Sequence, residues 1–171
     1  MTSYSESFFE KKRLGALMRQ SVVALPGNLL VAVCMVLLLD RNFSSGFLIF
    51  WLTAMTLAIL VRFLIACKYR FADKTSLNPK PWFIIYEISI FFMGARWGVL
   101  GIYVDLHFSL VYLSITLLII AGLAAASVST NAVSKPAFFC FAFPMITPIA
   151  VFLIGSGDFE LIVLGVIVGG F

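Results

Sequence analysis

The sequence is poor in charge and lacks the residue patterns on which catalysis commonly depends. Only 12% of its 171 residues are charged, whereas soluble globular domains average about 25%. It contains one histidine and three cysteines, and the cysteines have no Cys-x-x-Cys spacing. It has no cluster with metal-ligand spacing, no Ser/His/Asp set and no phosphate-binding glycine loop followed by Lys-Ser/Thr. These absences argue against a soluble enzyme and predict neither a catalytic site nor a metal or cofactor in this stretch.

Long apolar runs are what the sequence has in abundance. Hydrophobic residues make up 62% of the chain, and its mean hydropathy is +1.08. Runs of about 20 apolar residues are long enough to cross a bilayer as helices. We therefore predict an all-α polytopic membrane helix bundle whose lipid partner is the bilayer itself. The five predicted full spans are residues 21–39, 46–67, 82–104, 109–130 and 137–154.

The chain divides into two parts. Residues 1–20 form a basic lead-in, and residues 21–171 form the transmembrane bundle. The last apolar run, 159–171, would rise only about 20 Å as a helix, against a hydrocarbon core of about 30 Å. We expect it to be a truncated sixth span, with further protein beyond residue 171.

Basic residues gather on one side of the predicted topology. Nine lie in the lead-in and in the second and fourth connections, and one, Arg41, lies on the other side. The positive-inside rule therefore predicts a multi-pass protein with a cytoplasmic N-terminus. The net charge of +4 is read as a sign of topology, and no nucleic-acid partner is predicted.

Two intramembrane charges are placed at the same depth. Arg62 lies five residues before the end of its predicted span, and Glu87 lies five residues after the start of the next. Each is then about 7.5 Å deep, so we predict a structural ion pair. The alternative is that Arg62 snorkels to the headgroups while Glu87 is protonated or hydrated. Asn28 is a further candidate for a buried polar residue.

A third charge, Arg96, lies on the face of its span opposite Glu87. The functional interpretation is a ligand contact in an outward-facing pocket with an aromatic wall. The alternatives are outward snorkelling or a bond to Asp40 or Asp105. The candidate ligand-binding residues are Arg96, Trp97, Tyr103 and Ser89.

Small residues and prolines predict where helices pack and bend. Gly94, Gly98 and Gly101 share one helix face and predict close helix packing. Pro144 and Pro148 predict a bend in the fifth span, either a simple kink or a hinge.

Several of these features together resemble a known family. They are Leu17-Met18-Arg19-Gln20, Asn28-Leu29-Leu30, Trp51 with a late Arg62, Gly94-Ala95-Arg96-Trp97-Gly98-Val99-Leu100-Gly101, and Pro136 with Pro144 and Pro148. The chain resembles the six-span N-terminal membrane sensory domain of bacterial sensor histidine kinases and GGDEF/EAL signalling proteins. The resemblance implies an inner-membrane homodimer that passes a signal, such as a small molecule, to a cytoplasmic histidine kinase or diguanylate cyclase/phosphodiesterase domain.

The alternative function is a small membrane transporter or channel subunit. In that case Arg62, Glu87 and Arg96 would line a polar path through the bundle. Transporters usually carry more intramembrane polar groups and inverted repeats than this sequence shows. The sensory interpretation is therefore preferred.

Overall fold

The chain folds into six α-helices, as shown by a computed structural model that describes residues 2–40, 44–73, 78–107, 110–131, 133–156 and 159–169. No strand occurs in those ranges. The helices are α1 (Thr2–Leu39), α2 (Ser45–Phe71), α3 (Pro79–His107), α4 (Leu110–Asn131), α5 (Lys135–Gly155) and α6 (Phe159–Gly169). Helices α1 to α5 are each long and apolar enough to cross a membrane. The predicted fold class, an all-α membrane helix bundle, is confirmed.

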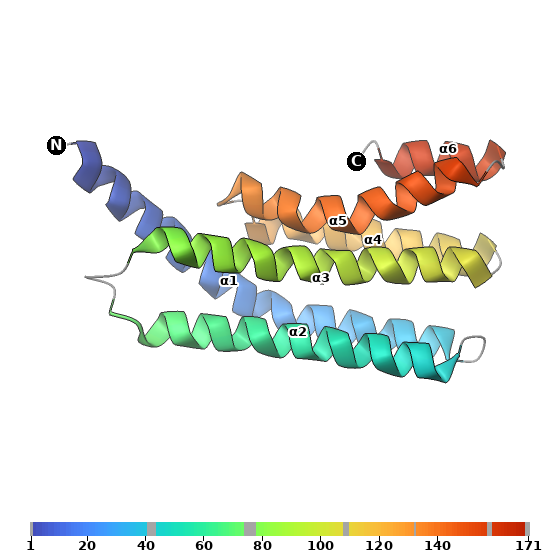
Figure 1. Cartoon of the computed structure of the whole chain (residues 1–171), viewed down its shortest axis with the longest axis horizontal. Helices are drawn as coiled ribbons and strands as arrows, with labels where there is room; N and C mark the ends of the chain where they lie inside the picture. The colour runs from blue at the N-terminus through green and yellow to red at the C-terminus, as the bar shows by residue number, and fades with distance from the viewer. Residues whose placement is uncertain are drawn as a thin grey trace.

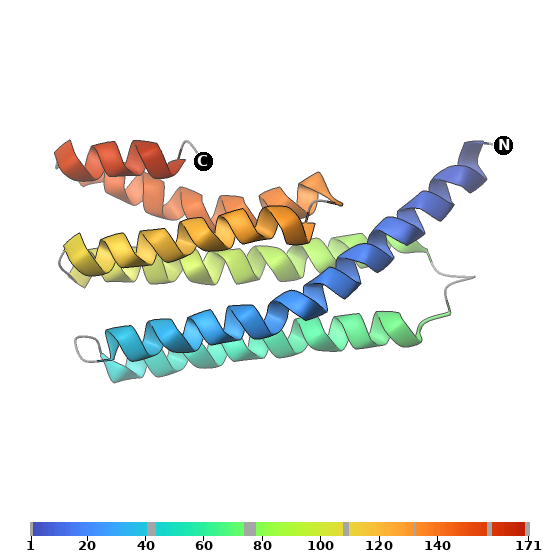
Figure 2. The same cartoon turned by 180° about the vertical axis from the view of Figure 1, so that it is seen from behind.

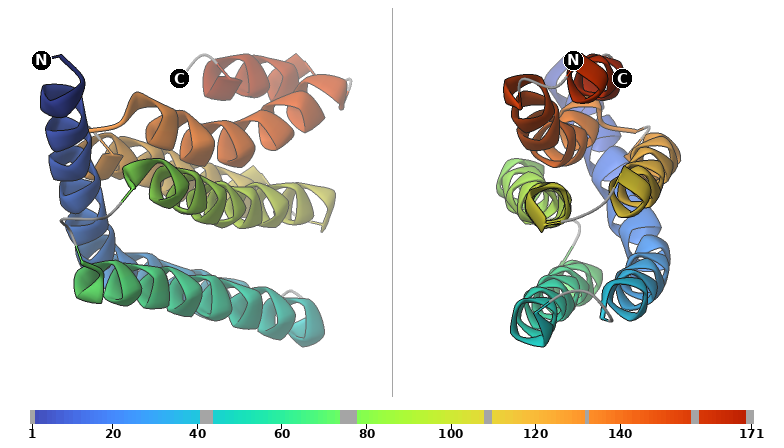
Figure 3. Two further views of the ribbon diagram at one scale, coloured as in Figure 1. Left: turned by 60° about the vertical axis from the view of Figure 1, so that its left-hand side comes forward. Right: turned by 90° about the vertical axis from the view of Figure 1, so that its right-hand side faces the viewer.

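The helices stack as three antiparallel hairpins. Seen end-on, α1 and α2 form one layer, α3 and α4 the middle layer, and α5 and α6 the third (Figure 3). The most extensive contact between any two helices is that of α3 with α5. Helix α6 has 11 residues and folds back along α5 (Figure 1).

The lead-in and the first span form one continuous helix. We predicted that the span would begin at residue 21, but α1 contains 38 residues and includes Pro26. It changes direction along its length, so its N-terminal part leaves the line of the other helices (Figure 2). A proline inside a helix removes one backbone hydrogen bond, which makes such a bend cheaper.

Packing explains why the basic lead-in is helical. Leu14, Leu17 and Met18 recur at helical spacing and are buried. The Arg13 guanidinium donates two hydrogen bonds, of 3.1 and 2.8 Å, to the carbonyl oxygen of Val133 in the connection between α4 and α5. The lead-in is therefore part of the bundle and contacts the connection between its second and third hairpins.

The outer surface of the described bundle is apolar, as lipid contact requires. Side chains such as Phe50, Leu118 and Phe143 are 71%, 74% and 65% exposed, respectively. In water these side chains would form unfavourable patches, whereas in hydrocarbon they need no cover.

Helix α3 occupies the centre of the bundle. Its residues Met93, Trp97 and Leu100 are fully buried. The rings of Trp97 and Trp51 meet edge-on, with their centroids 5.2 Å apart. Trp51 Nε1 also donates a 2.9 Å hydrogen bond to the carbonyl oxygen of Arg96. This contact fixes α2 against the middle of α3.

Candidate functional site

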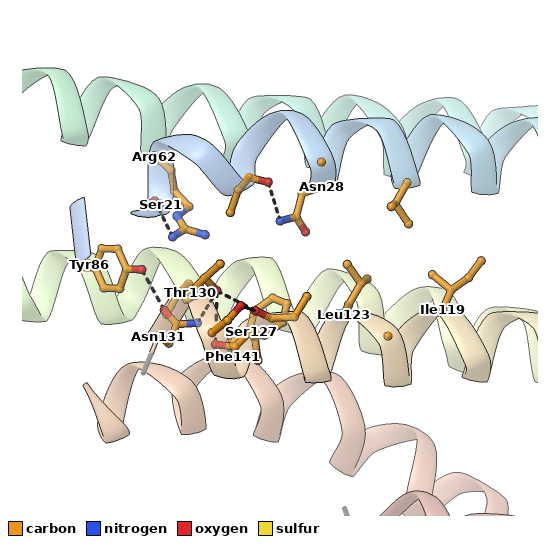
Figure 4. Close-up of a pocket in the computed structure, with 17 residues that line it drawn as sticks. Ser21, Asn28, Arg62, Tyr86, Ile119, Leu123, Ser127, Thr130, Asn131 and Phe141 are labelled. Carbon is orange, nitrogen blue, oxygen red and sulfur yellow. Dashed lines mark hydrogen bonds between the residues drawn. The ribbon is translucent and has the colours of Figure 1, made fainter. Parts of the chain in front are cut away.

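A cavity of about 460 Å³ lies between the first and second hairpins. Residues of α1, α2, α3 and α4 form its walls, and Phe141 of α5 closes one side. Figure 4 shows polar side chains gathered at one end, with Ile119 and Leu123 at the other. The cavity is therefore amphipathic along its length.

Arg62 is the charged group of the polar end. It is only 6% exposed, and it lies nine residues before the last residue of α2, or about 13.5 Å along the helix at 1.5 Å per residue. Its Nη2 donates a 2.8 Å hydrogen bond to Ser21 Oγ, and its Nη1 contacts Met93 Sδ at 3.5 Å. The guanidinium carbon lies 5.2 Å from the centre of the Tyr86 ring.

Among the residues that the structure describes, Arg62 has no anionic partner. A hydroxyl, a thioether and an aromatic face are all neutral, and the Nε–H of Arg62 has no hydrogen-bond partner. A charge near the middle of a transmembrane helix costs about 2.5–3.5 kcal/mol on insertion scales. The side chain therefore needs compensation that its neutral partners supply only in part.

Tyr86 and Asn131 also line the polar end, beside Ser127 and Thr130 (Figure 4). The Tyr86 hydroxyl donates a 3.0 Å hydrogen bond to Asn131 Oδ1, and each residue is 2% exposed. Asn28 lies further along the cavity (Figure 4). Its Nδ2 donates to the Ala24 carbonyl at 3.2 Å, while its Oδ1 is buried without a partner.

Two glycines open onto the cavity. A Cβ atom added at Gly27 or at Gly122 would meet no atom within 4 Å, and both residues line the cavity. A Cβ at either position would therefore project into open space. These positions therefore provide a way to close the cavity while leaving Arg62 in place.

The structure does not bring Arg62 and Glu87 together. Arg62 faces α1 and the ring of Tyr86, whereas Glu87 lines a separate hollow between α3 and α5 that includes Phe91 and Cys140. The reason is rotation about the axis of α3. Adjacent helical residues are about 100° apart, so the orientation that places Tyr86 over Arg62 turns Glu87 away.

The four predicted ligand-binding residues are engaged separately. Arg96 Nη1 donates a 2.8 Å hydrogen bond to the Phe92 carbonyl of its own helix, and Ser89 Oγ donates to the Tyr86 carbonyl at 2.7 Å. Trp97 is fully buried in the core. The Tyr103 ring stacks on that of Phe47, with their centroids 3.6 Å apart. The side chain of Asp105, an alternative partner for Arg96, lies outside the part of the chain that is described.

The glycine and proline positions meet at one interface. Gly94 and Gly98 of α3 lie against the α5 backbone around Phe141 and Pro144. Gly101 lies against the Ile149 side chain. Pro144 and Pro148 are inside α5, which bends along its length (Figure 1). We call this interface of α3 and α5 the glycine seam.

The polar end of the cavity was only partly foreseen from the sequence. Arg62 and Asn28 stood out as polar residues in apolar runs. Ser21, Tyr86 and Asn131 did not, because Ser21 and Asn131 lie at predicted span ends and Tyr86 lies among other aromatic residues. The described residues contain no group of three His, Cys, Asp or Glu residues that could hold a metal ion.

Comparison with known proteins adds no relative. No protein-family model, no curated protein and no solved structure matches the chain. The cavity and the glycine seam are therefore interpreted from their own geometry.

Proposed function

We propose that this chain is the membrane-embedded input domain of a bacterial signalling protein, with a cytoplasmic output domain of the histidine kinase or cyclic-di-GMP type. The observation that best supports this proposal is the position of Phe141. Its side chain lines the cavity, and its backbone carbonyl abuts Gly94 in the glycine seam. A change in what fills the cavity would therefore act directly on the contact between α3 and α5.

The seam offers a route from the cavity to α6. Two prolines weaken the hydrogen-bond ladder of α5, so bending there costs less than in an ordinary helix. Helix α6 packs on the far half of α5, where Gly165 and Gly169 lie beside Leu153 and Ala150. Signalling requires two arrangements whose populations a stimulus shifts. A bend in α5 that moves α6 would supply them.

Locking α6 to α5 is expected to abolish signalling. The Cβ of Ala150 lies 3.3 Å from a Cβ built on Gly169, near the range of about 3.5–4.5 Å found in disulfides. The test uses a cysteine-free background carrying Ala150→Cys and Gly169→Cys, joined to a diguanylate cyclase domain. In the reduced protein, filling the cavity with Gly122→Leu should change cyclase activity, and in the oxidised protein it should not. Gly46→Leu, in α2 and outside the cavity, is the control and should leave cyclase activity unchanged in both redox states. An equal response in both redox states would contradict the proposal.

The proposal places the protein in the inner membrane with its N-terminus in the cytoplasm. The C-terminal end of α2, whose last turn carries Lys68 and Arg70, and the N-terminal end of α5, which begins at Lys135, lie at the end of the bundle that holds the N-terminus (Figure 1). In a cysteine-free background, a membrane-impermeant maleimide should label Ser156→Cys in intact cells and leave Asn78→Cys unlabelled until lysis. Both side chains are exposed. The reverse pattern would invert the topology.

The second candidate function is a small transporter or channel subunit. The observation that favours it is the same cavity, because a buried charge in a membrane-embedded cavity is also typical of substrate pathways. Anion flux into liposomes that contain the purified chain would support transport. An in-frame kinase, GGDEF or EAL domain beyond the codon for Phe171 would support the input domain.

A further inference from the structure

The polar end of the cavity offers a positive charge with unused hydrogen-bonding capacity. Arg62 is buried, its Nε–H is unpaired, and its other contacts are neutral. Guanidinium groups favour carboxylate and phosphate oxygens because several N–H groups point in a fixed fork. An anionic oxygen placed in the cavity beside the guanidinium would neutralise its charge.

The rest of the cavity selects against a small hydrated anion. Beyond the polar end, the walls are made by Val31, Ile90, Ile119, Leu123 and Phe141. An inorganic ion would leave this apolar surface unused. Asn28 Oδ1 accepts hydrogen bonds and so takes no part in holding an anionic head. An apolar chain would pack against this wall.

From these observations, we infer that the cavity binds a single amphiphile, with its anionic head on Arg62 and its apolar chain along α1 and α4. The cavity volume of about 460 Å³ falls within the range of about 300–1,000 Å³ that is usual for small-molecule sites. The shared chemistry is a carboxylate or phosphate head joined to an acyl chain. Its source is either a free single-chain acid or an anionic membrane lipid.

Whether the amphiphile binds does not depend on the proposed function. Only the effect of binding, a signal passed toward α6, rests on it. Occupancy of the cavity would be the stimulus that the Phe141 contact passes to the glycine seam. Binding is measured on the purified chain alone, without an output domain. A failure to bind and a failure to signal are therefore separate results.

Binding is tested with radiolabelled dodecanoate on the chain in a neutral detergent, and dodecanol serves as the uncharged probe of equal length. We expect one saturable dodecanoate site per chain and at least tenfold weaker binding of dodecanol. Arg62→Gln should weaken dodecanoate binding at least tenfold, and Arg62→Lys, which keeps the charge but not the fork of N–H groups, should weaken it less. Equal affinity for dodecanol and dodecanoate would overturn the inference.

Cavity-filling variants keep the test decisive if Arg62 variants fail to fold. Gly122→Leu should abolish dodecanoate binding although Arg62 is intact, and Gly155→Leu, at an open glycine outside the cavity, should leave binding unchanged. Unchanged binding in Gly122→Leu would overturn the inference.

Competition experiments then separate the two possible sources of the amphiphile, a free acid and a membrane lipid. Displacement by phosphatidylglycerol but not by diacylglycerol, which has no anionic head, assigns the head to a membrane lipid, and displacement by neither assigns it to a free acid. Displacement by diacylglycerol would show that the charge is not recognised, which contradicts the assignment.

Discussion

Gly94→Ala and Gly98→Ala are expected to destabilise the bundle, whereas the same change at Gly27 or Gly155 should be neutral or stabilising. A Cβ on Gly94 would collide with the carbonyl oxygen of Phe141, and one on Gly98 would lie 2.6 Å from that of Pro144. Both obstacles are backbone atoms, so the whole of α5 must move to relieve the clash. Overpacking of this kind costs about 1–3 kcal/mol, and in lipid such close packing is a main source of helix association.

The control glycines show whether a change in stability on Gly→Ala comes from the seam, because the expected change there has the opposite sign. A Cβ on Gly27 or Gly155 meets nothing within 4 Å. Alanine is about 1 kcal/mol better than glycine in a helix interior, which applies to Gly27, whereas the gain should be smaller at Gly155, the last residue of α5. Thermal unfolding in one detergent, followed by circular dichroism, compares the variants. We expect Gly94→Ala and Gly98→Ala to lower the Tm by several degrees, on a scale of about 2–4 °C per kcal/mol. Gly101→Ala should have a smaller effect, because it meets the movable end of the Ile149 side chain. A common shift at all of these glycines would show that the seam is not closely packed.

The glycine positions illustrate what sequence can predict here. Residues 94, 98 and 101 share a face in any helix, so their spacing alone predicts a close-packed contact. Which helix approaches them depends on the order of the three hairpins, and no local pattern encodes that order. The structure places α5 there, and the same choice determines that Phe141 closes the cavity.

Arg62 and Glu87 show more clearly what the sequence cannot predict, which is how each helix is rotated about its axis. Their depths follow from counting residues to the helix ends, because the rise per residue is fixed. The rotation of each helix is set by packing across the whole interface. In an almost uniformly apolar helix such as α3, the hydrophobic pattern hardly constrains rotation. A pairing argued from depth alone therefore missed Tyr86 as the aromatic partner of Arg62.

The extent of the first helix was underestimated for a different reason. Spans were predicted from apolar runs, and Lys11, Lys12, Arg13 and Arg19 interrupt that signal. A helix only needs one apolar face to pack, and Leu14, Leu17 and Met18 supply it. Charged residues at the remaining positions extend the helix toward the headgroups instead of ending it.

Trp97→Ala is expected to cost about 3 kcal/mol in the free energy of unfolding, whereas Trp97→Phe should cost about 1 kcal/mol. The indole is fully buried and packs edge-on against Trp51, so alanine leaves a cavity at the centre of the bundle. Its Nε1–H is buried without a hydrogen-bond partner. Phenylalanine therefore loses no hydrogen bond and retains most of the aromatic contact.

The contrast between these two variants separates a core role for Trp97 from the ligand-wall role suggested by its position beside Arg96. Denaturant titration in detergent measures both variants, and Trp82→Ala is the control. Trp82 is only partly buried and meets one ring, Tyr69, at 5.4 Å, so its loss should be less costly. If Trp97 lined a ligand pocket, Trp97→Ala would change ligand binding with little loss of stability, because the space it vacates would already be open. A Trp97→Ala protein as stable as Trp82→Ala would therefore contradict the buried position, and with it the packing of α2 on α3 that holds Arg62 in the cavity.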